Sequence, residues 1–199
     1  NYILSLIEKS NIPVKYLPKD KMNRMADSIH QGVIAEVKDY EYEELENVMR
    51  ENGFLVILDH LEDPHNFGAI IRTCECAGVD YIIIPRNRSV SVNSTVYKTS
   101  CGALANVKII EVVNLTNTIT KLKDLGFWVY GAEANGKNYS NIKFDTKTCL
   151  VIGSEGHGLK QIVTKNCDEI ISLPMKGKIN SLNASVACGI LIYEIMKYK

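Results

Sequence analysis

The 199-residue sequence predicts an α/β fold in which helices cover both faces of a parallel sheet. From residue 53 onward, short apolar runs alternate with segments whose apolar residues recur at helical spacing. The short runs are continuous and rich in β-branched residues, as expected of strands that are buried on both faces. Ligands of such sheets bind beyond the carboxyl ends of the strands, so the residues that follow each strand are expected to form any site.

The alternation places the individual elements. Strands are expected at Phe54–Asp59, Tyr81–Pro85, Val107–Glu111, Phe127–Ala132, Leu150–Gly153 and Glu169–Leu173. Helices are expected at Asn66–Ala77, Ser94–Cys101, Leu115–Leu125, Gly158–Thr164 and Asn183–Met196. Together these elements make residues 53–199 one α/β domain.

Two further parts precede this domain. Residues 1–38 resemble a small α/β unit that is too short to bury much surface by itself. Its expected helices and strands are Tyr2–Lys9, Pro13–Leu17, Lys19–Ser28 and Gly32–Val37. Residues 39–52 are expected to form an acidic linker or a short acidic helix, because residues 36–51 hold seven acids and only two bases.

Composition limits the classes of function. The 23 acids and 23 bases give a net charge of zero, which argues weakly against nucleic-acid binding. Outside residues 36–51, however, bases outnumber acids by 21 to 16, so the rest of the chain is mildly basic. No apolar run is long enough for a membrane span, and no signal peptide is evident. The six cysteines lack metal-ligand spacing, which favours reduced thiols in a cytoplasmic protein without a metal site.

Two loops after expected strands carry unusual residues. In D-H-L-E-D-P-H-N-F-G-A-I-I-R, residues 59–72, Asn66 alone would be a plain helix cap, and Arg72 alone a snorkelling surface arginine. In I-G-S-E-G-H-G-L, residues 152–159, the glycine spacing is neither G-x-G-x-x-G nor G-x-S-x-G. A bare glycine turn needs no carboxylate, so Glu155 indicates a site.

A third unusual segment opens the last expected helix. In K-I-N-S-L-N-A-S, residues 178–185, four Asn or Ser side chains stand where a helix start needs one cap. A redundantly capped helix is the alternative explanation. If the surplus side chains face the same crevice as the other two loops, they form a cluster whose members are Asn66, Arg72, Glu155, Ser181 and Asn183.

These loops together resemble the three motifs of the SpoU family of RNA 2′-O-ribose methyltransferases, in the SPOUT superfamily. The matching segments are D-P-H-N-F-G-A-I-I-R, V-I-G-S-E-G-H-G-L and I-S-L-P-M-K-G-K-I-N-S-L-N-A-S-V-A, and they stand in order within residues 53–199. H-Q-G-V-I-A-E-V, residues 30–37, resembles the end of the N-terminal RNA-binding domain of the TrmH/RlmB branch. That domain is longer and L30e-like in the relatives, so the resemblance leads us to expect that residues 1–38 are a truncated copy.

The resemblance implies a C-terminal trefoil knot, S-adenosylmethionine as the methyl donor, an RNA substrate and a homodimer. It implies catalytic roles for Arg72, Asn66, Glu155, Ser181 and Asn183. The donor would be bound by Gly153, Glu155, Gly156, Leu173, Pro174, Met175, Leu182 and Asn183. Exposed bases and one histidine are expected to contact RNA, namely Arg86, Arg88, Lys176, Lys178 and His30.

Chemistry suggests how the cluster would act. A guanidinium stays protonated, so we expect Arg72 to grip a flanking phosphate bidentately and to stabilise the incipient alkoxide. A phosphate oxygen or Glu155 would take the proton, Asn66 would position Arg72, and Ser181 and Asn183 would hold the ribose and the donor in register.

The expected substrate is a guanosine of large-subunit 23S rRNA, with a tRNA ribose as the second candidate. Two other classes of function remain open from the sequence. One is a non-catalytic RNA-binding module on the same fold. The other is a nucleotide-binding α/β enzyme of a different class, which the missing G-x-G-x-x-G and Walker motifs disfavour.

Overall fold

The computed structural model describes residues 2–26, 30–48 and 53–199. The chain divides into two compact units, Asn1–Asp39 and Tyr40–Lys199, each of which is described by itself.

The first unit contains two helices among its described residues, α1 (Tyr2–Lys9) and α2 (Lys19–Met25). The strands expected at Pro13–Leu17 and Gly32–Val37 are wrong, because both segments are irregular and largely exposed. A strand needs a hydrogen-bonding partner, and neither segment is paired. The helix expected at Lys19–Ser28 ends at Met25, where Ala26 is extended with φ −100° and ψ 128°; its last two expected residues lie outside the described ones.

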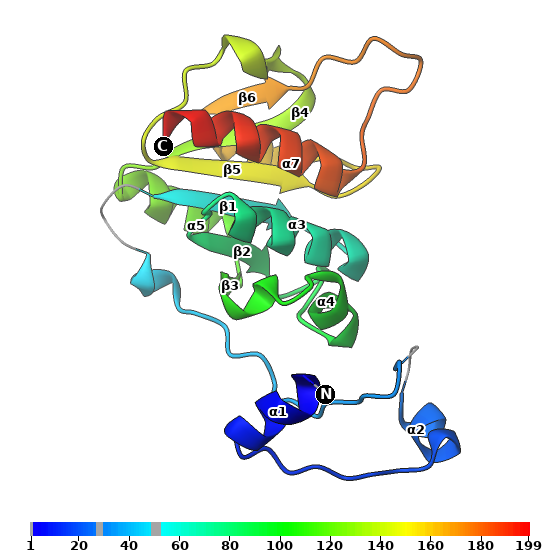
Figure 1. Ribbon diagram of the computed structural model, residues 1–199. Coiled ribbons are helices and arrows are strands. Elements are labelled where there is room, and N and C mark those ends of the chain that lie inside the picture. Colours follow the sequence, from blue (N-terminus) through cyan, green and yellow to red (C-terminus); the bar gives the residue numbers. More distant parts are fainter. Residues whose placement is uncertain (1, 27–29, 49–52) are drawn as a thin grey trace. The chain divides into compact units, whose positions relative to one another are not determined.

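Residues 53–199, all of which the structure describes, form a six-stranded parallel sheet in the order β3-β2-β1-β5-β4-β6 (Figure 1). The parallel α/β prediction is confirmed. The strands are β1 (Phe54–Asp59), β2 (Tyr81–Pro85), β3 (Lys108–Val112), β4 (Trp128–Asn138), β5 (Thr148–Gly153) and β6 (Glu169–Ser172).

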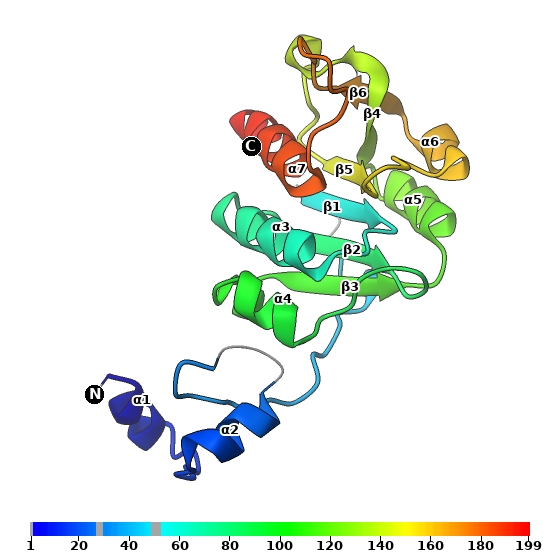
Figure 2. The ribbon, with the colours of Figure 1, turned by 90° about the vertical axis from the view of Figure 1, so that its right-hand side faces the viewer.

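Helices lie on both faces of this sheet (Figure 2). The helices α3 (Pro64–Cys76), α4 (Ser94–Thr99) and α7 (Ala184–Ile195) cover one face, and α5 (Leu115–Asp124) and α6 (Gln161–Asn166) cover the other. Alternate side chains of β1 point to opposite faces of the sheet. Leu58 packs in the hydrophobic cluster beneath α3 and α7, and Ile57 packs in the cluster beneath α5 and α6. Because both faces are covered, every residue of β1 is buried.

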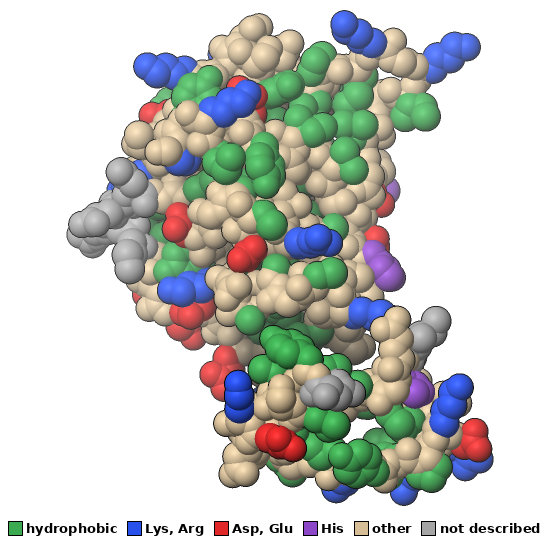
Figure 3. All heavy atoms as spheres, in the orientation of Figure 1, with side chains coloured by type: hydrophobic (Ala, Val, Ile, Leu, Met, Phe, Trp, Pro, Cys, Tyr) green, Lys and Arg blue, Asp and Glu red, His purple; other side chains and the backbone are tan. Residues whose placement is uncertain are grey.

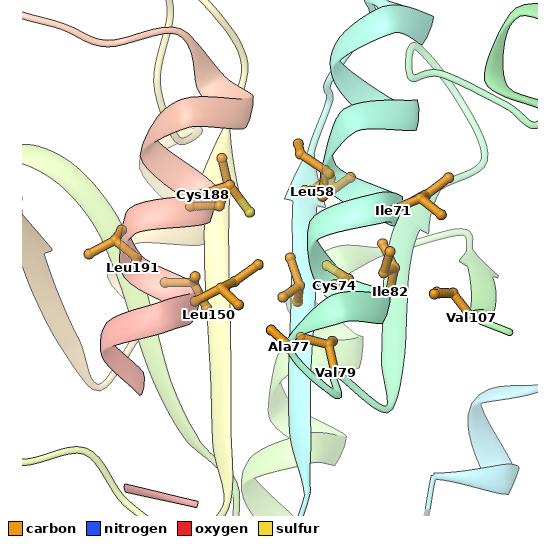
Figure 4. Close-up of a cluster of buried hydrophobic side chains, with 14 of the residues drawn as sticks. Leu58, Ile71, Cys74, Ala77, Val79, Ile82, Val107, Leu150, Cys188 and Leu191 are labelled. Atoms are coloured by element: carbon orange, nitrogen blue, oxygen red, sulfur yellow. The ribbon is translucent and has the colours of Figure 1, made fainter. Parts of the chain in front are cut away.

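The core beneath α3 and α7 is the layer that positions the site. Figure 4 shows Cys188 and Leu191 of α7 on one side, and Cys74 and Ile71 of α3 on the other, above the strand residues Leu58 and Leu150. Burial of such side chains contributes about 1.5–3 kcal/mol each. This packing brings the first turns of α3 and α7 to the carboxyl end of the sheet.

Several element boundaries differ from the prediction for local reasons. α6 begins at Gln161 rather than at Gly158, because Gly158 has the left-handed φ of +64° and pairs with Ser154. α4 ends at Thr99, and Cys101 beyond it also has a positive φ of 53°. β4 extends to Asn138 through a register shift between Ala132 and Lys137, which sequence periodicity does not reveal.

Residues 40–48, expected within an acidic linker or short acidic helix, form an edge segment that contains the short 3₁₀ helix η1 (Leu45–Asn47) and contacts the outer edge of β3 through Tyr40 and Glu43. The Glu43 N–H donates to the Ile109 carbonyl at 2.8 Å. The Tyr40 hydroxyl donates to the Val107 carbonyl at 3.1 Å and accepts from the Ile109 N–H at 3.3 Å. An uncovered strand edge invites pairing with other chains, so this edge segment protects the sheet. Arg50 and Glu51 lie outside the described residues.

Candidate active site

The loops that follow β1 and β5 start side by side, because these strands are neighbours in register as far as Asp59 and Gly153. The buried Asp59 carboxylate ties the loops together. It accepts from the Lys160 backbone N–H at 2.7 Å, and its other oxygen lies 2.5 Å from His60 Nδ1. Since α7 packs against α3, the segment that leads into α7 reaches the same edge.

Asn66, Glu155 and Asn183 form a closed hydrogen-bond network at this edge. The Asn66 side-chain amide donates to Glu155 Oε1 at 2.9 Å. The Asn183 amide donates to the same Glu155 oxygen at 2.6 Å and to Asn66 Oδ1 at 2.9 Å. Asn66 is buried, whereas Glu155 and Asn183 remain exposed. The structure thus brings together one predicted residue from each of the three loops.

Asn183 has two roles among the polar residues that precede α7. Its Oδ1 caps the helix by accepting from the backbone N–H groups of Ser185 and Val186, at 3.0 and 3.3 Å. Its Nδ2 belongs to the network. One side chain therefore caps the helix and joins the site, and the exposed Ser181 takes part in neither set of hydrogen bonds.

Arg72 lies on α3, six positions after Asn66, and does not contact Asn66. Its Nη1 lies 3.8 Å from the Cys101 Sγ, and the residue is exposed. The side-chain partners of Asn66 are Glu155 and Asn183, so the expected positioning of Arg72 by Asn66 is not what the structure shows. Instead, α3 and α4 pack closely at Gly68, where an added Cβ would lie 1.9 Å from Thr99 Oγ1. This packing places Cys101 beside Arg72.

The glycine loop, residues 153–158, is closed by two backbone hydrogen bonds. Ser154 N–H donates to the Gly158 carbonyl at 3.1 Å, and Gly158 N–H donates to the Ser154 carbonyl at 3.0 Å. An added Cβ at Gly153 would lie 2.1 Å from the Gly158 carbonyl carbon, so Gly153 is required for closure. At Gly156, with φ +83°, no atom lies within 4 Å of an added Cβ. The loop therefore exposes backbone that a ligand can approach closely, and these residues fit a nucleoside donor held by main-chain groups.

The other expected donor-binding residues lie between β6 and α7. Leu173 packs against the core beneath α7, whereas Pro174, Met175 and Leu182 are exposed. Their side chains are thus available to a ligand rather than used in the core.

The residues expected to contact RNA differ in their exposure and in their partners. Arg86 Nε pairs with Glu111 at 2.8 Å, so its charge is partly compensated. Arg88, Lys176 and Lys178 are exposed. His30 belongs to the first unit, where its ring nitrogens lie 2.9 Å from Asn23 Oδ1 and from the Gly32 N–H that donates to it.

Glu133 is a residue of the site that sequence reasoning missed. Its Oε1 accepts from the Leu159 N–H at 2.6 Å, immediately after the glycine loop. The signal was present, because Glu133 follows the expected strand Phe127–Ala132 and the residues after strands are the ones that form sites.

Among the residues that the structure describes, no cluster of His, Cys, Asp and Glu side chains is suited to a metal ion. Within the same residues, no helix has the length and apolarity that crossing a bilayer requires.

Comparison with known proteins decides the family. Residues 53–193 match the sequence profile of the SpoU rRNA Methylase family. The chain belongs to this family. Residues 1–43 match the profile for RNA 2′-O ribose methyltransferase substrate binding. The resemblance seen in the three motifs is thereby confirmed.

Individual relatives agree with the SpoU assignment. A Staphylococcus aureus (strain COL) protein named for the TrmH family of tRNA/rRNA methyltransferases is 45% identical over 204 residues, covering 99% of this chain and 82% of that protein. The AdoMet-bound rRNA methyltransferase of Sinorhizobium meliloti superposes with a TM-score of 0.74 at 25% identity, over 79% of this chain and 61% of that one. The TrmH/SpoU tRNA modifying enzyme of A. aeolicus gives a TM-score of 0.67 at 30% identity, over 75% and 76%.

Proposed function

We propose that this SpoU protein is an S-adenosylmethionine-dependent RNA 2′-O-ribose methyltransferase. The observation that carries the proposal is the network of Asn66, Glu155 and Asn183, which joins the three family motifs at the carboxyl end of a parallel sheet. A relative of this fold was solved with AdoMet bound, and the backbone-exposing glycine loop fits the same donor.

S-adenosylmethionine supplies an electrophilic methyl group on a sulfonium cation. Charge is dispersed during such a transfer, so alignment of the ribose oxygen contributes more than a strong oxyanion hole. The network supplies this alignment by holding the glycine loop, the start of α3 and the start of α7 in fixed relation.

Arg72 is the group best suited to hold the RNA. Its guanidinium is exposed and carries paired donors that match a phosphate. We assign it to the phosphate beside the reacting ribose, where it also stabilises the developing alkoxide. Ser181 and Asn183 lie at the entry to α7 and hold the ribose side of the site.

Glu155 acts as an organiser in this account. Its Oε1 already accepts from the amides of Asn66 and Asn183 and, at 3.3 Å, from the Ala184 N–H. These three hydrogen bonds use Glu155 Oε1 to hold the glycine loop against the starts of α3 and α7. We therefore assign the ribose proton to a phosphate oxygen rather than to Glu155.

A guanosine of 23S rRNA is the proposed substrate, and a tRNA ribose is the alternative. The H-Q-G segment supports the rRNA branch, and the substrate-binding profile over residues 1–43 supports an RNA substrate without distinguishing its class. The names of the relatives include both tRNA and rRNA enzymes. Mapping 2′-O-methylation in rRNA and tRNA from a deletion strain decides between them, because the site that loses its methyl group identifies the substrate.

A homodimer in the cytoplasm is also proposed. Val186, Ile190 and Tyr193 repeat along α7 with exposed fractions of 50%, 39% and 46%. Figure 3 shows hydrophobic side chains on the face that α7 lies on. An apolar stripe of this kind suits self-association about a two-fold axis, which sedimentation analysis would reveal. Six free cysteines suit a reducing compartment.

A trefoil knot is proposed for the C-terminal part. β5 lies between β1 and β4, and α7 returns from the far strand β6 to pack on α3 and β5. A threaded chain end accounts for that return.

Calorimetry with S-adenosylmethionine tests the proposed function. A native-state ligand releases or absorbs heat and raises thermal stability by mass action. Parallel titrations with NAD and ATP serve as controls for another class of nucleotide-binding enzyme. Binding of the methionine-derived ligand alone supports the proposal, whereas no heat and no stabilisation at saturating concentrations would contradict it.

A further inference from the structure

Glu133 stands between the two segments that the proposed donor site uses. It lies on β4, and β4 lies between β5, which leads into the glycine loop, and β6, which leads into residues 173–183. Regular pairing of β4 with β6 stops at Ala132 and resumes at Lys137. Glu133 is the first residue of this interrupted stretch, so its direction is set by the register shift rather than by the regular sheet.

The Glu133 carboxylate is held tightly against the glycine loop. Oε1 accepts from the Leu159 N–H at 2.6 Å. A Cβ added to Gly158 would lie 2.8 Å from Oε1 and 3.2 Å from Oε2, so the carboxylate rests against the Gly158 α-carbon. The residue is half-buried. Its charge is therefore at a fixed place beside the loop.

Glu133 is partly buried and has no cationic side-chain partner among the described residues. Three other half-buried acids are paired: Glu111 with Arg86, Asp168 with Lys123 and Glu169 with Lys137. Glu43 and Glu75, which are also half-buried, accept from side-chain amides instead. Within the described part of the chain, no Lys, Arg or His side chain forms an ion pair with Glu133. A partly desolvated carboxylate without a counter-charge is costly, so a cationic ligand would be favoured there.

We propose that Glu133 is a further donor-binding residue that recognises the positive charge of the methyl donor. The inference rests on the proposed function. In the transfer, the bond from the methyl carbon to the ribose oxygen forms while the carbon–sulfur bond breaks. The bonding pair stays on sulfur, and the ribose proton passes to the phosphate oxygen assigned above. The sulfonium cation becomes a neutral thioether, so the attraction to Glu133 is lost at that moment, and the spent product is released more readily.

The test compares ligands that differ in charge. Glu133→Gln removes the charge but keeps an amide oxygen that can accept from Leu159 N–H. Calorimetry should show S-adenosylmethionine binding weakened about tenfold, with S-adenosylhomocysteine binding changed by less than about twofold, since both carry an α-ammonium group but only the former carries the sulfonium cation. Sinefungin carries an ammonium in place of the sulfonium, so its binding should weaken by about the same factor as that of S-adenosylmethionine. The matched control Glu62→Gln, an exposed acid in the loop after β1, should leave the ratio of the two affinities unchanged.

Two more variants separate charge from loop anchoring. Glu133→Asp keeps the charge and should retain most of the discrimination. Glu133→Ala removes both the charge and the acceptor for Leu159 N–H, so the affinities for S-adenosylmethionine and S-adenosylhomocysteine should both fall. The ratio of the two affinities should shift by the same factor as in Glu133→Gln. Glu133→Ala also replaces the glutamine variant if that one does not fold.

Equal weakening of both ligands in the neutral variants would show that Glu133 only anchors the loop, and would overturn the inference while leaving the proposed function intact. If the unaltered protein bound neither ligand, the proposed function itself would fail, and the inference with it.

Discussion

The Asn183 side-chain amide donates a 2.6 Å hydrogen bond to Glu155 Oε1, joining residues that are 28 positions apart in the chain. That hydrogen bond is made by the Nδ2 atom of Asn183, whereas the Oδ1 atom of the same side chain caps α7. Helix α7 and the glycine loop are therefore coupled through the two ends of a single side chain. This arrangement makes Glu155 an acceptor at the centre of the network.

Replacing Glu155 distinguishes an organiser from a general base. Glu155→Gln keeps an oxygen that can accept from Asn66, Asn183 and Ala184, so turnover should fall by no more than about tenfold, whereas loss of a general base costs roughly a hundredfold or more. Glu155→Ala removes the acceptor and leaves the donors of the buried Asn66 unmatched, which lowers the free energy of unfolding by about 1–3 kcal/mol. Single-turnover methyl transfer and urea unfolding measure the two effects.

Asn183→Asp provides the companion variant. Its carboxylate can still cap α7, so stability is largely kept, but it cannot donate to Glu155 and places a like charge beside it. Methyl-transfer activity should fall while helix α7 remains folded.

For the Glu155 variants, the opposite result would be a Glu155→Gln variant as inactive as Glu155→Ala, and it would make Glu155 the proton acceptor.

Arg72→Lys tests whether geometry or charge holds the RNA. Lysine keeps the charge but lacks the planar pair of donors. Turnover should fall on the order of a hundredfold, as with loss of a positioned donor in other enzymes, and Arg72→Ala should be nearly as impaired. Donor affinity, measured by calorimetry, should barely move. A lysine variant with near-normal turnover would show that charge suffices.

Much of the fold was predictable because apolar periodicity records burial directly. β1 and β2 begin and end at the predicted residues, and the helices on both faces follow the expected alternation. The errors lie where pairing rather than periodicity decides. The edge segment contacts β3 through the Tyr40 hydroxyl and the loop before α4 through the Tyr42 hydroxyl, and tyrosines among acids give no sign of which segment they will meet.

The site was predictable at the level of loops but not of contacts. Strand order brings Asn66, Glu155 and Asn183 together, and motif resemblance identified all three. The contact between Arg72 and Cys101 depends on how closely α3 approaches α4 at Gly68, which is a tertiary distance. Glu133 was missed because its direction depends on the register shift in β4.

The buried thiol of Cys188 predicts a pH dependence of stability. Burial raises the pKa of this thiol from 9.0 to about 12. The folded protein then keeps a proton that the unfolded chain releases, so the free energy of unfolding is fully retained below pH 9.0 and falls as the pH rises toward about 12. The expected slope is about 1 kcal/mol per pH unit. The thiols of Cys74, Cys149 and Cys167 also have raised pKa values because of burial and add to the total slope. In urea titrations, Cys188→Ala should therefore reduce the slope by about 1 kcal/mol per pH unit; an unchanged slope would assign the dependence to the other groups.

Salt dependence of RNA binding locates the RNA-facing surface. Each phosphate that a basic side chain neutralises releases counterions, so replacing Arg88, Lys176 or Lys178 with Ala should reduce the logarithmic salt slope by about one. Neutralising Glu41 and Glu44 in the edge segment should leave the slope almost unchanged, since that segment lies along β3. The opposite pattern in filter-binding titrations would place the RNA on the edge segment.

The most direct test of the central claim is the chemical position of the transferred methyl group. The protein is incubated with RNA and S-adenosylmethionine labelled in its methyl group, and the RNA is then hydrolysed in alkali. Alkaline cleavage needs a free 2′-hydroxyl, so a 2′-O-methyl group protects its own linkage. The account predicts label in alkali-resistant dinucleotides, and none with Arg72→Ala. Label in mononucleotides would show methylation of a base, and absence of label from every rRNA and tRNA offered would contradict the assigned activity.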